Sequence, residues 1–582
     1  MVEKDLLVTR RDVVRGGGAL TLATAAPSVR PAFALEDGSL VATGVVFEDR
    51  SGTGRRQPSD PGIAGVLVSN GREVVKTDND GRYALPVDDE TIIFVIKPTG
   101  YAVPVDRGTM LPRFYYIHHP KGTPAHLGLR YGGIEPSGPL PGSIDFALKK
   151  VDEPSRFDVL MFTDPHAGSA AELDFIRDDV VNPLIGTKAA FGLTTGDIMS
   201  DDLSLYARYN RIIGQLGVPW HNIVGNHDLN LDAPDGKYSR ETFKQTFGPS
   251  YYAFEHGGVL FLMLDNVDYF GARAGESGSD CRYQGRFGRR QLAFVANVFK
   301  ETPADRLVVA AMHIPLRTYL DPDDPASNTA DGAALIRLLG ERPSISFSGH
   351  THTTEHHYLG GEGGNPGRAA HHHHVMTAVS GSWWSGPYDH RGVAVADSHD
   401  GTPNGFHILT IDRNRATTRY QPAKEPNARQ ARIVLDSEYH RAQIEIGAQK
   451  DSASDLRMSQ LVGSPIREDN AGATDVLVNV FDGGPRTSVE YRIGERTPVR
   501  MERERRIDPF VKEVFARNEA TKKPWVQAEP CSHLWVARLP ADLAAGTHCI
   551  KVRVTDEYGR EHHAHLVLEV IGTRAASVVA PG

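Results

Sequence analysis

The pattern of apolar and polar positions changes along the chain and divides most of it into three parts. Residues 36–150 contain short alternating runs such as "EVVKTDNDGRYALPV" and "TIIFVIKP", separated by glycine, proline and an Asp80-Gly81 turn. This pattern predicts a small antiparallel β-domain. In residues 155–404, "RFDVLMFTD" is typical of a buried strand, whereas "RRQLAFVANVFK" places apolar residues at helical spacing. We therefore expect an α/β domain in the middle of the chain.

The third part, residues 405–582, is again rich in strand patterns. Runs such as "GFHILTID", "DVLVNVFDG" and "HCIKVRVTD" are separated by turn residues, which is typical of a β-sandwich. The middle domain is thus expected to lie between two β-domains.

The first 34 residues differ from everything that follows them. Arg10 and Arg11 precede a short, weakly apolar stretch that ends in Ala32-Phe33-Ala34. This layout resembles a twin-arginine signal peptide cleaved after Ala34, and predicts export by that route to the periplasm or the extracellular space. The apolar stretch falls short of the ~18 to 20 residues that a membrane span needs, and no later segment reaches that length. We expect no membrane span.

The charge of the chain bears on its possible partners, and its cysteine content bears on possible disulfides. The net charge is −9 and the sequence pI is near 6.3, without a dense run of lysine and arginine, so a nucleic-acid-binding patch is not expected. The chain has three cysteines. Simple hairpin pairing would not place Cys531 opposite Cys549, so we expect no disulfide between them, and Cys281 is expected to be unpaired.

The candidate chemistry of the middle domain lies in five short motifs, each at the end of an apparent strand. In open α/β sheets, groups beyond the carboxyl ends of strands can meet in one crevice. The set contains two aspartates, one asparagine and four histidines and no thiolate, which suits two metal ions of the zinc, iron or manganese kind. The motifs are "MFTDPH" with Asp164 and His166, "LTTGD" with Asp197, "VGNHD" with Asn226 and His227, "VVAAMH" with His313, and "SFSGHTH" with His350 and His352.

The order and spacing of these motifs resemble those of the calcineurin-like metallophosphoesterases. The segment "HHHHVMTAVSGSWWSGPYDHRG" and the strand-rich tail are similar to an exported bacterial branch of that family, and residues 36–150 resemble transthyretin-like or carboxypeptidase-regulatory-like modules. The resemblance implies an α/β fold: a four-layer α/β/β/α sandwich over residues 155–404, flanked by two β-sandwich domains. It also implies a binuclear centre of two divalent or trivalent ions.

Carried over residue by residue, the resemblance makes Asp197 the carboxylate that bridges the ions. It assigns Asp164, His166 and His352 to one ion, and Asn226, His313 and His350 to the other. His227 would act as the general acid.

The residue that orients His227 stays open at this stage. Asp228 is its neighbour in the sequence and is the first candidate. Many family members have an acidic residue three positions after the bridging aspartate, but this chain has Ser200 there, and Asp201 and Asp202 follow it.

The resulting hypothesis is an exported phosphoesterase that hydrolyses phosphate mono- or diesters through in-line attack by a metal-bridging hydroxide. Its substrate would be a small phosphate ester or an envelope-derived phosphoester. The alternative is a cell-envelope or glycan-binding protein with a degenerate phosphoesterase domain.

Two further features of the sequence lie close to the last metal-ligand motif. The run His371 to His374 is expected to alternate between buried and exposed faces of a strand. Trp383 and Trp384 belong either to the core or to a loop that stacks on substrate.

Overall fold

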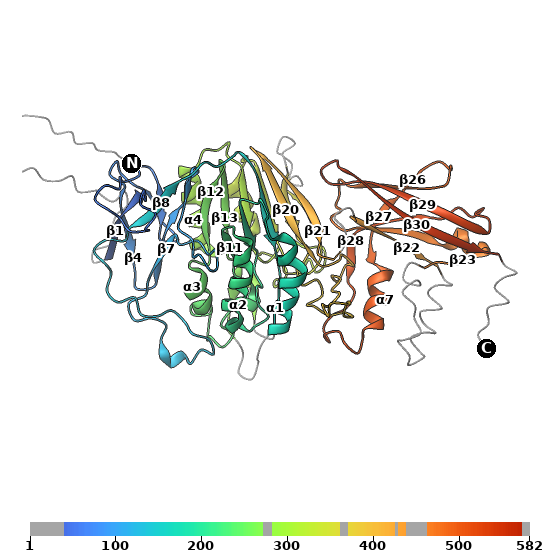
Figure 1. Ribbon diagram of the computed structural model, residues 1–582, viewed down its shortest axis with the longest axis horizontal. Helices are drawn as coiled ribbons and strands as arrows, with labels where there is room; N and C mark the ends of the chain where they lie inside the picture. The colour runs from blue at the N-terminus through green and yellow to red at the C-terminus, as the bar shows by residue number, and fades with distance from the viewer. Residues whose placement is uncertain (1–39, 272–281, 361–369, 425–428, 438–462, 573–582) are drawn as a thin grey trace, which may run out of the picture.

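The computed structural model describes residues 40–271, 282–360, 370–424, 429–437 and 463–572, and all structural statements below concern these residues. Figure 1 shows a mixed α/β fold with many sheets: a small β-region at one end, an α/β region in the middle and a second β-region at the other end. The predicted signal peptide and Cys281 lie outside the described residues. No helix within the described ranges is long and apolar enough to cross a membrane.

The N-terminal β-region consists of two four-stranded sheets with the orders β4-β1-β8-β6 and β3-β2-β5-β7. Gly81 has a φ of 77°, as the predicted Asp-Gly turn requires. The strands are β1 (Leu40–Glu48), β2 (Leu67–Ser69), β3 (Val74–Lys76), β4 (Arg82–Val87), β5 (Thr91–Ile96), β6 (Tyr101–Ala102), β7 (Tyr115–His118) and β8 (Phe146–Lys150).

The middle region contains a five-stranded sheet of order β11-β10-β9-β20-β21 and a six-stranded sheet of order β12-β13-β16-β17-β19-β18. The first sheet is formed by β9 (Arg156–Phe162), β10 (Phe191–Thr194), β11 (Trp220–Asn222), β20 (Gly405–Asp412) and β21 (Arg415–Pro422). The second is formed by β12 (Tyr252–His256), β13 (Val259–Met263), β16 (Val308–Ala311), β17 (Ser344–Ser348), β18 (Glu355–Leu359) and β19 (His371–Val375). Strand β14 (Val267–Tyr269) pairs antiparallel with β15 (Tyr283–Gly285) in a separate two-stranded sheet.

The two sheets of the middle region pack against each other through aromatic side chains. Phe191 of β10 lies 5.1 Å from Phe261 of β13 between ring centroids. Helices α1 (Ala170–Ile176) and α2 (Tyr206–Ile213) pack against the first sheet, and α4 (Gly288–Glu301) and α5 (Gly332–Leu339) share an apolar core with the second. The spacing that predicts a helix in "RRQLAFVANVFK" is confirmed, since Val295, Val298 and Phe299 of α4 are buried.

The boundary predicted at residue 405 is wrong. Strand β20 pairs antiparallel with β9, the strand that leads into the first metal-ligand motif, and β21 pairs with β20. Both strands therefore belong to the sheet of the middle region. An antiparallel hairpin has the same alternating pattern whether it joins a sandwich or the edge of an α/β sheet, so the sequence pattern could not place it.

The C-terminal β-region has one sheet of order β22-β24-β28-β27 and another of order β23-β30-β29-β25-β26, with a shared apolar core. A short helix, α7 (Pro509–Arg517), begins at Asp508, whose side chain accepts a hydrogen bond from the Phe510 N–H. The strands are β22 (Ala431–Asp436), β23 (Ile466–Arg467), β24 (Asp475–Val480), β25 (Ser488–Ile493), β26 (Val499–Arg500), β27 (Glu502–Ile507), β28 (Pro530–Arg538), β29 (Gly546–Thr555) and β30 (Glu561–Ile571). Cys531 and Cys549 are free, as expected.

The prediction of alternating exposure for the histidine run is wrong. His371, His373 and His374 are buried and His372 is half-buried. The reason is the position of β19, which lies between β17 and β18 in the six-stranded sheet. A strand inside a sheet that is covered on both faces has no solvent face.

Candidate metal centre

The five predicted motifs lie at the carboxyl ends of five strands, as expected. Strands β9, β10 and β11 run parallel in one sheet, and β16 and β17 run parallel in the other. The loops that follow them meet between the two sheets. The structure brings together all seven predicted metal ligands: Asp164, His166, Asp197, Asn226, His313, His350 and His352.

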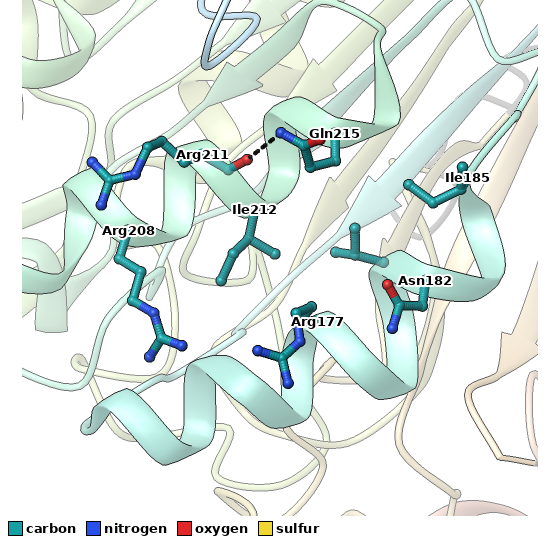
Figure 2. A pocket seen from close by; sticks show the side chains of 8 residues that line it. Arg177, Asn182, Ile185, Arg208, Arg211, Ile212 and Gln215 are labelled. Carbon is teal, nitrogen blue, oxygen red and sulfur yellow. Dashed lines mark hydrogen bonds between the residues drawn. The ribbon is translucent and has the colours of Figure 1, made fainter.

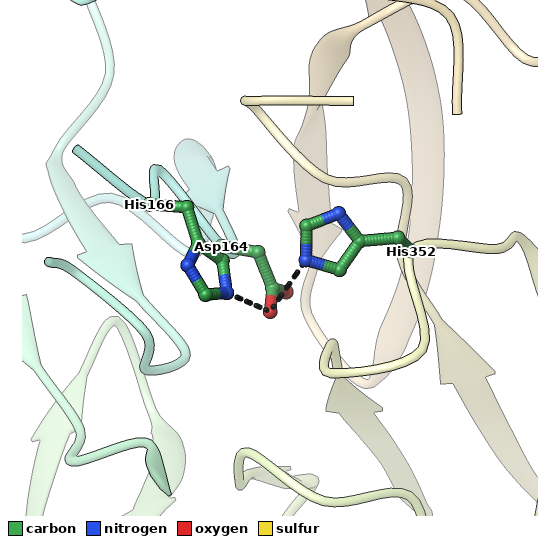
Figure 3. Close-up of side chains that lie close together, drawn as sticks. All are labelled: Asp164, His166 and His352. Carbon is green, nitrogen blue, oxygen red and sulfur yellow. Dashed lines mark ion pairs between the residues drawn. The ribbon is translucent and has the colours of Figure 1, made fainter. Parts of the chain in front are cut away.

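One group of ligand atoms is formed by Asp164, His166 and His352, all of them buried. Figure 3 shows His166 and His352 on opposite sides of the Asp164 carboxylate. Asp164 and His166 come from the loop after β9, and His352 comes from the loop after β17. His352 Nε2 lies 3.6 Å and His166 Nε2 3.9 Å from Asp164 Oδ1. These separations leave space for a cation between the three side chains.

Asp197 joins this group to a second one. Its Oδ2 lies 3.0 Å from His166 Nε2 and 3.1 Å from His313 Nε2, so a single carboxylate faces one histidine of each group. His313 Nε2 also lies 2.9 Å from Asn226 Oδ1 and 3.1 Å from His350 Nδ1. This arrangement is the one expected of a carboxylate that bridges two ions.

The outer ring nitrogens fix which nitrogen faces the centre. His313 Nδ1 lies 2.9 Å from the Thr195 carbonyl oxygen and donates to it, and His352 Nδ1 donates to the Gly381 carbonyl. A proton on Nδ1 leaves Nε2 as the nitrogen of each ring that can bind a cation. His352 Nε2 is buried and has no hydrogen-bond partner among the described residues.

Burial favours the neutral, ligating form of several of these rings. It lowers the pKa of His166 to about 4 and that of His350 to about 3. Neutral imidazoles beside carboxylates form a donor set that suits zinc, iron or manganese. The orphaned His352 nitrogen and this donor set fit two metal ions.

His227 projects beside the metal ligands and is more accessible than most of them, with 19% of its side chain exposed. Its Nδ1 lies 2.7 Å from Asp201 Oδ1, and its backbone N–H donates to Asp197 Oδ1 over 2.8 Å. Burial lowers the pKa of His227, but the charges of Asp197 and Asp201 outweigh this and raise it to about 9. Asp201 therefore orients His227.

Asp228 does not orient His227, contrary to the first candidate from the sequence. Its carboxylate accepts hydrogen bonds from the backbone N–H groups of Gly225, Ile198 and Met199, at 2.9 to 3.2 Å. Residues 226–228 form a 3₁₀ turn, in which successive side chains point in different directions. Asp228 is fully buried and joins the loop after β11 to the loop after β10.

Backbone strain is concentrated at this centre. Of the ten non-glycine residues with positive φ in the described ranges, five are predicted ligands: Asp164, His166, Asp197, His350 and His352. The left-handed region is unfavourable for such residues, and strain of this kind clusters at active sites.

Glycine permits the close approach of the two loops that meet at the bridging carboxylate. Gly225 has a φ of −108°, which any residue can adopt. A Cβ at this position would nevertheless lie 2.1 Å from Asp197 N and 2.2 Å from Asp197 Oδ1. The role of Gly225 is therefore close packing and not a turn with positive φ.

Tryptophan side chains line one side of the centre, and the sequence analysis predicted only some of them. The Trp383 ring stacks on His352 with centroids 3.8 Å apart, whereas Trp384 is buried. Trp525, from the C-terminal region, lies 6.4 Å from Trp383 between centroids and is 57% exposed. Sequence analysis missed Trp525, although a tryptophan inside the polar stretch "TKKPWVQ" was a usable signal.

A separate hollow of about 460 Å³ lies between residues 177–185, which follow α1, and residues 208–215, in and just after α2 (Figure 2). Arg177, Arg208 and Arg211 line it, but none of the predicted metal ligands does. Arg177 and Arg208 already bind Asp174 through 2.6 and 2.7 Å contacts. Because none of the predicted metal ligands lines this hollow, it is not part of the metal centre. Two of its three arginines are already paired with Asp174.

Comparisons with known proteins agree with this geometry. The family model described as calcineurin-like phosphoesterase matches residues 157–354. Models of the N-terminal and C-terminal parts of calcineurin-like phosphoesterase match residues 50–128 and 373–562. Comparison with curated proteins gave no match.

Several solved structures are similar to the chain. A dimetal phosphatase from Danio rerio is 13% identical, with a TM-score of 0.32, over 47% of this chain and 98% of its own. A purple acid phosphatase from yellow lupin (Lupinus luteus) seeds is 13% identical, with a TM-score of 0.32, over 62% and 68% of the two chains. A structure of PhoD is 10% identical, with a TM-score of 0.33, over 66% and 87%. On the strength of the three family models, the chain contains the N-terminal, catalytic and C-terminal domains of calcineurin-like phosphoesterases.

Proposed function

We propose that the protein is an exported, binuclear metal-dependent phosphoesterase. The observation that supports this most directly is the position of Asp197 Oδ2, 3.0 Å from His166 Nε2 and 3.1 Å from His313 Nε2. A carboxylate between two sets of neutral nitrogen and oxygen ligands is what a pair of cations requires. All seven ligand positions are filled by competent side chains, which argues against a degenerate enzyme that only binds envelope or glycan.

Each residue of the centre has a defined task in this proposal. Asp164, His166 and His352 would hold one ion, Asn226, His313 and His350 would hold the other, and Asp197 would contribute to both. When bound, two ions of the iron, zinc or manganese class supply Lewis acidity and lower the pKa of coordinated water.

His227 supplies the proton for the leaving group. Asp201 holds its Nδ1 at 2.7 Å, which leaves Nε2 free to carry a proton towards the ester. A leaving alkoxide requires such a proton, and a positioned histidine provides it. Trp383 and the exposed Trp525 would contact the organic part of the substrate.

The proposal extends to features beyond the centre. The two sheets of the catalytic domain, with α1 and α2 on one side and α4 and α5 on the other, would form a four-layer α/β/β/α sandwich flanked by two β-sandwich domains. Residues 1–34 would direct export through the twin-arginine route. The substrate would be a small or envelope-derived phosphate mono- or diester, met outside the cytoplasm.

The test combines a substrate screen with metal analysis of residues 35–582. The protein is assayed on mono- and diesters with iron, zinc and manganese in turn. Asp197→Ala should abolish hydrolysis and lower the metal content by about two ions per chain, because one carboxylate contacts both ions. Asp158→Ala is the matched control, since this carboxylate is on the same sheet but its side chain binds only the Thr410 hydroxyl among the contacts described. Full metal content in the Asp197 variant would refute the assignment.

A further inference from the structure

A second cluster of histidines surrounds one carboxylate at the junction of the catalytic and C-terminal domains. Asp482 lies just after β24 in the C-terminal domain and is buried. Its Oδ1 is 3.0 Å from His374 Nε2, 3.2 Å from His356 Nε2 and 3.3 Å from His407 Nε2. All three histidine residues are no more than 1% exposed. None of these four residues belongs to the catalytic centre described above.

The four residues come from two sheets and from a turn of the C-terminal domain. His356 and His374 are directly opposite each other on β18 and β19, in the six-stranded sheet. His407 is on β20, in the five-stranded sheet, and Asp482 comes from the C-terminal domain. Figure 1 places β20 and β21 on the side of the catalytic domain that faces the C-terminal sheets. The cluster therefore lies where both catalytic sheets meet the C-terminal domain.

Hydrogen bonds do not account for this arrangement. His356 and His407 can each donate to Asp482 Oδ1. His374 Nε2 is the nearest of the three nitrogens, yet neither nitrogen of this fully buried ring has a hydrogen-bond partner among the described residues. A buried polar group without a partner is unfavourable and needs an explanation. A cation between the nitrogens and the oxygen would satisfy it.

The ligand atoms of His356, His374 and Asp482 all lie within 4.8 Å of one another, which is the spacing of atoms that share one metal ion. At the usual zinc–nitrogen distance, neighbouring ligand atoms of a tetrahedral site are about 3.3 Å apart. The three nitrogens lie 3.0 to 3.3 Å from Asp482 Oδ1. In the catalytic centre of the same chain, Asp197 Oδ2 is 3.0 and 3.1 Å from two ligand nitrogens. The separations match those of the metal centre already described.

The surroundings of the cluster also suit a metal ion. His356 and His374 stack with ring centroids 4.0 Å apart, which is unfavourable for two imidazolium cations. His356 Nδ1 lies 2.9 Å from His372 Nε2, and a hydrogen bond to the outer nitrogen orients a ligating imidazole.

We propose that His356, His374 and Asp482, whose ligand atoms all lie within 4.8 Å of one another, bind a third metal ion, Zn²⁺, which joins the C-terminal domain to the six-stranded sheet of the catalytic domain. His407, whose Nε2 lies 3.3 Å from the same Asp482 oxygen, lies beside this group and is the candidate for the fourth position of a tetrahedral shell. All four side chains are buried, so the ion is structural. The ligands do not overlap with those of the catalytic ions. This site therefore stands independently of the proposed phosphoesterase activity.

The test is metal analysis of the full mature chain loaded with zinc and passed through a desalting column. Wild-type protein should retain about three ions per chain, two catalytic and one structural. His374→Gln should lose one ion and unfold at lower temperature, while kcat on a phosphate ester at low temperature stays within about twofold of wild type. His357→Gln is the matched control: His357 is the neighbour of His356 on β18, is equally buried and binds Glu355 instead.

Two results would overturn the proposal. One is an unchanged metal content in His374→Gln. The other comes from Asp197→Ala, which does not depend on whether the His374 variant folds. This variant should keep one ion per chain, and after exchange with Co²⁺ that ion should give the strong visible absorption of a tetrahedral site. An Asp197 variant without any bound ion would show that the cluster does not bind metal, whatever the activity of the wild-type enzyme.

Discussion

A close approach between two loops of the catalytic centre makes Gly225→Ala a sensitive perturbation. The added methyl group would lie 2.1 Å from Asp197 N and 2.2 Å from Asp197 Oδ1. Ordinary van der Waals contacts of carbon begin near ~3.5 Å, so the loops must separate by about 1 Å. Asp197 Oδ2 would then leave its position 3.0 Å from His166 and 3.1 Å from His313.

A displacement of this size should lower activity strongly without unfolding the protein. Misplacement of a catalytic group by ~1 Å can cost about 10²-fold in rate, and we expect kcat/KM to fall by about that factor. Metal affinity should fall as well, because the bridging carboxylate is displaced from both ions.

The assay is kcat/KM on one phosphate ester at saturating metal, together with a metal titration. Gly132→Ala is the control, because a Cβ at Gly132 would meet nothing within 4 Å. If Gly225→Ala keeps wild-type kcat/KM and wild-type metal affinity, then Asp197 does not hold the position on which the proposed mechanism depends.

Four further outcomes are expected. His227→Asn should keep both catalytic ions and lose about 10²- to 10⁴-fold of its activity on alkyl phosphates. The loss of activity on a nitrophenyl ester should be clearly smaller, because this leaving group needs little protonation. Equal losses on the two substrates would exclude acid catalysis. Asp201→Asn should show the same dependence on the leaving group, but more weakly, because Asp201 acts only through its 2.7 Å contact with His227. A loss of activity of the same size on both esters would contradict that role. Replacement of Arg10 and Arg11 by lysine should leave active precursor inside the cell, measured by fractionation, and unchanged export would contradict the predicted signal. Burial raises the pKa of Glu153, but contacts with His256 and Lys97 outweigh it and lower the pKa to about 2. This carboxylate therefore stabilises the fold above pH ~4.5 and progressively less towards pH 2, so Glu153→Gln should flatten the pH dependence of unfolding in that window; an unchanged profile would contradict it.

The ligands of the catalytic centre could be predicted because the relevant signal is local. Each motif follows one apolar strand, and parallel strands bring their carboxyl ends to the same edge. The partner of His227 could not be predicted in this way. Asp228 is adjacent in sequence but its side chain turns into the protein, whereas Asp201 reaches His227 from another loop, at a residue with a φ of 66°.

The second histidine cluster shows a different limit of sequence analysis. His356 and His374 pair across neighbouring strands, but Asp482 is more than a hundred positions further along the chain. No short motif connects them, and the histidine run suggested only a strand. The position of the β20–β21 pair at one side of the five-stranded sheet could not be predicted for the same reason. Strand β20 pairs with β9, which is far away in the sequence.

Hydrogen bonds within the chain hold the strained backbone of the catalytic centre in its conformation. A left-handed non-glycine residue costs about 1 to 3 kcal/mol, and such residues persist only where the surroundings determine their conformation. Here the backbone N–H of Asp164 donates to the Gly196 carbonyl over 3.2 Å, and that of His166 donates to the Asp197 carbonyl over 3.0 Å. The His350 N–H donates to Asp164 Oδ1 over 3.1 Å. These bonds are made by the chain alone, so the folding of the two sheets sets the strained conformation.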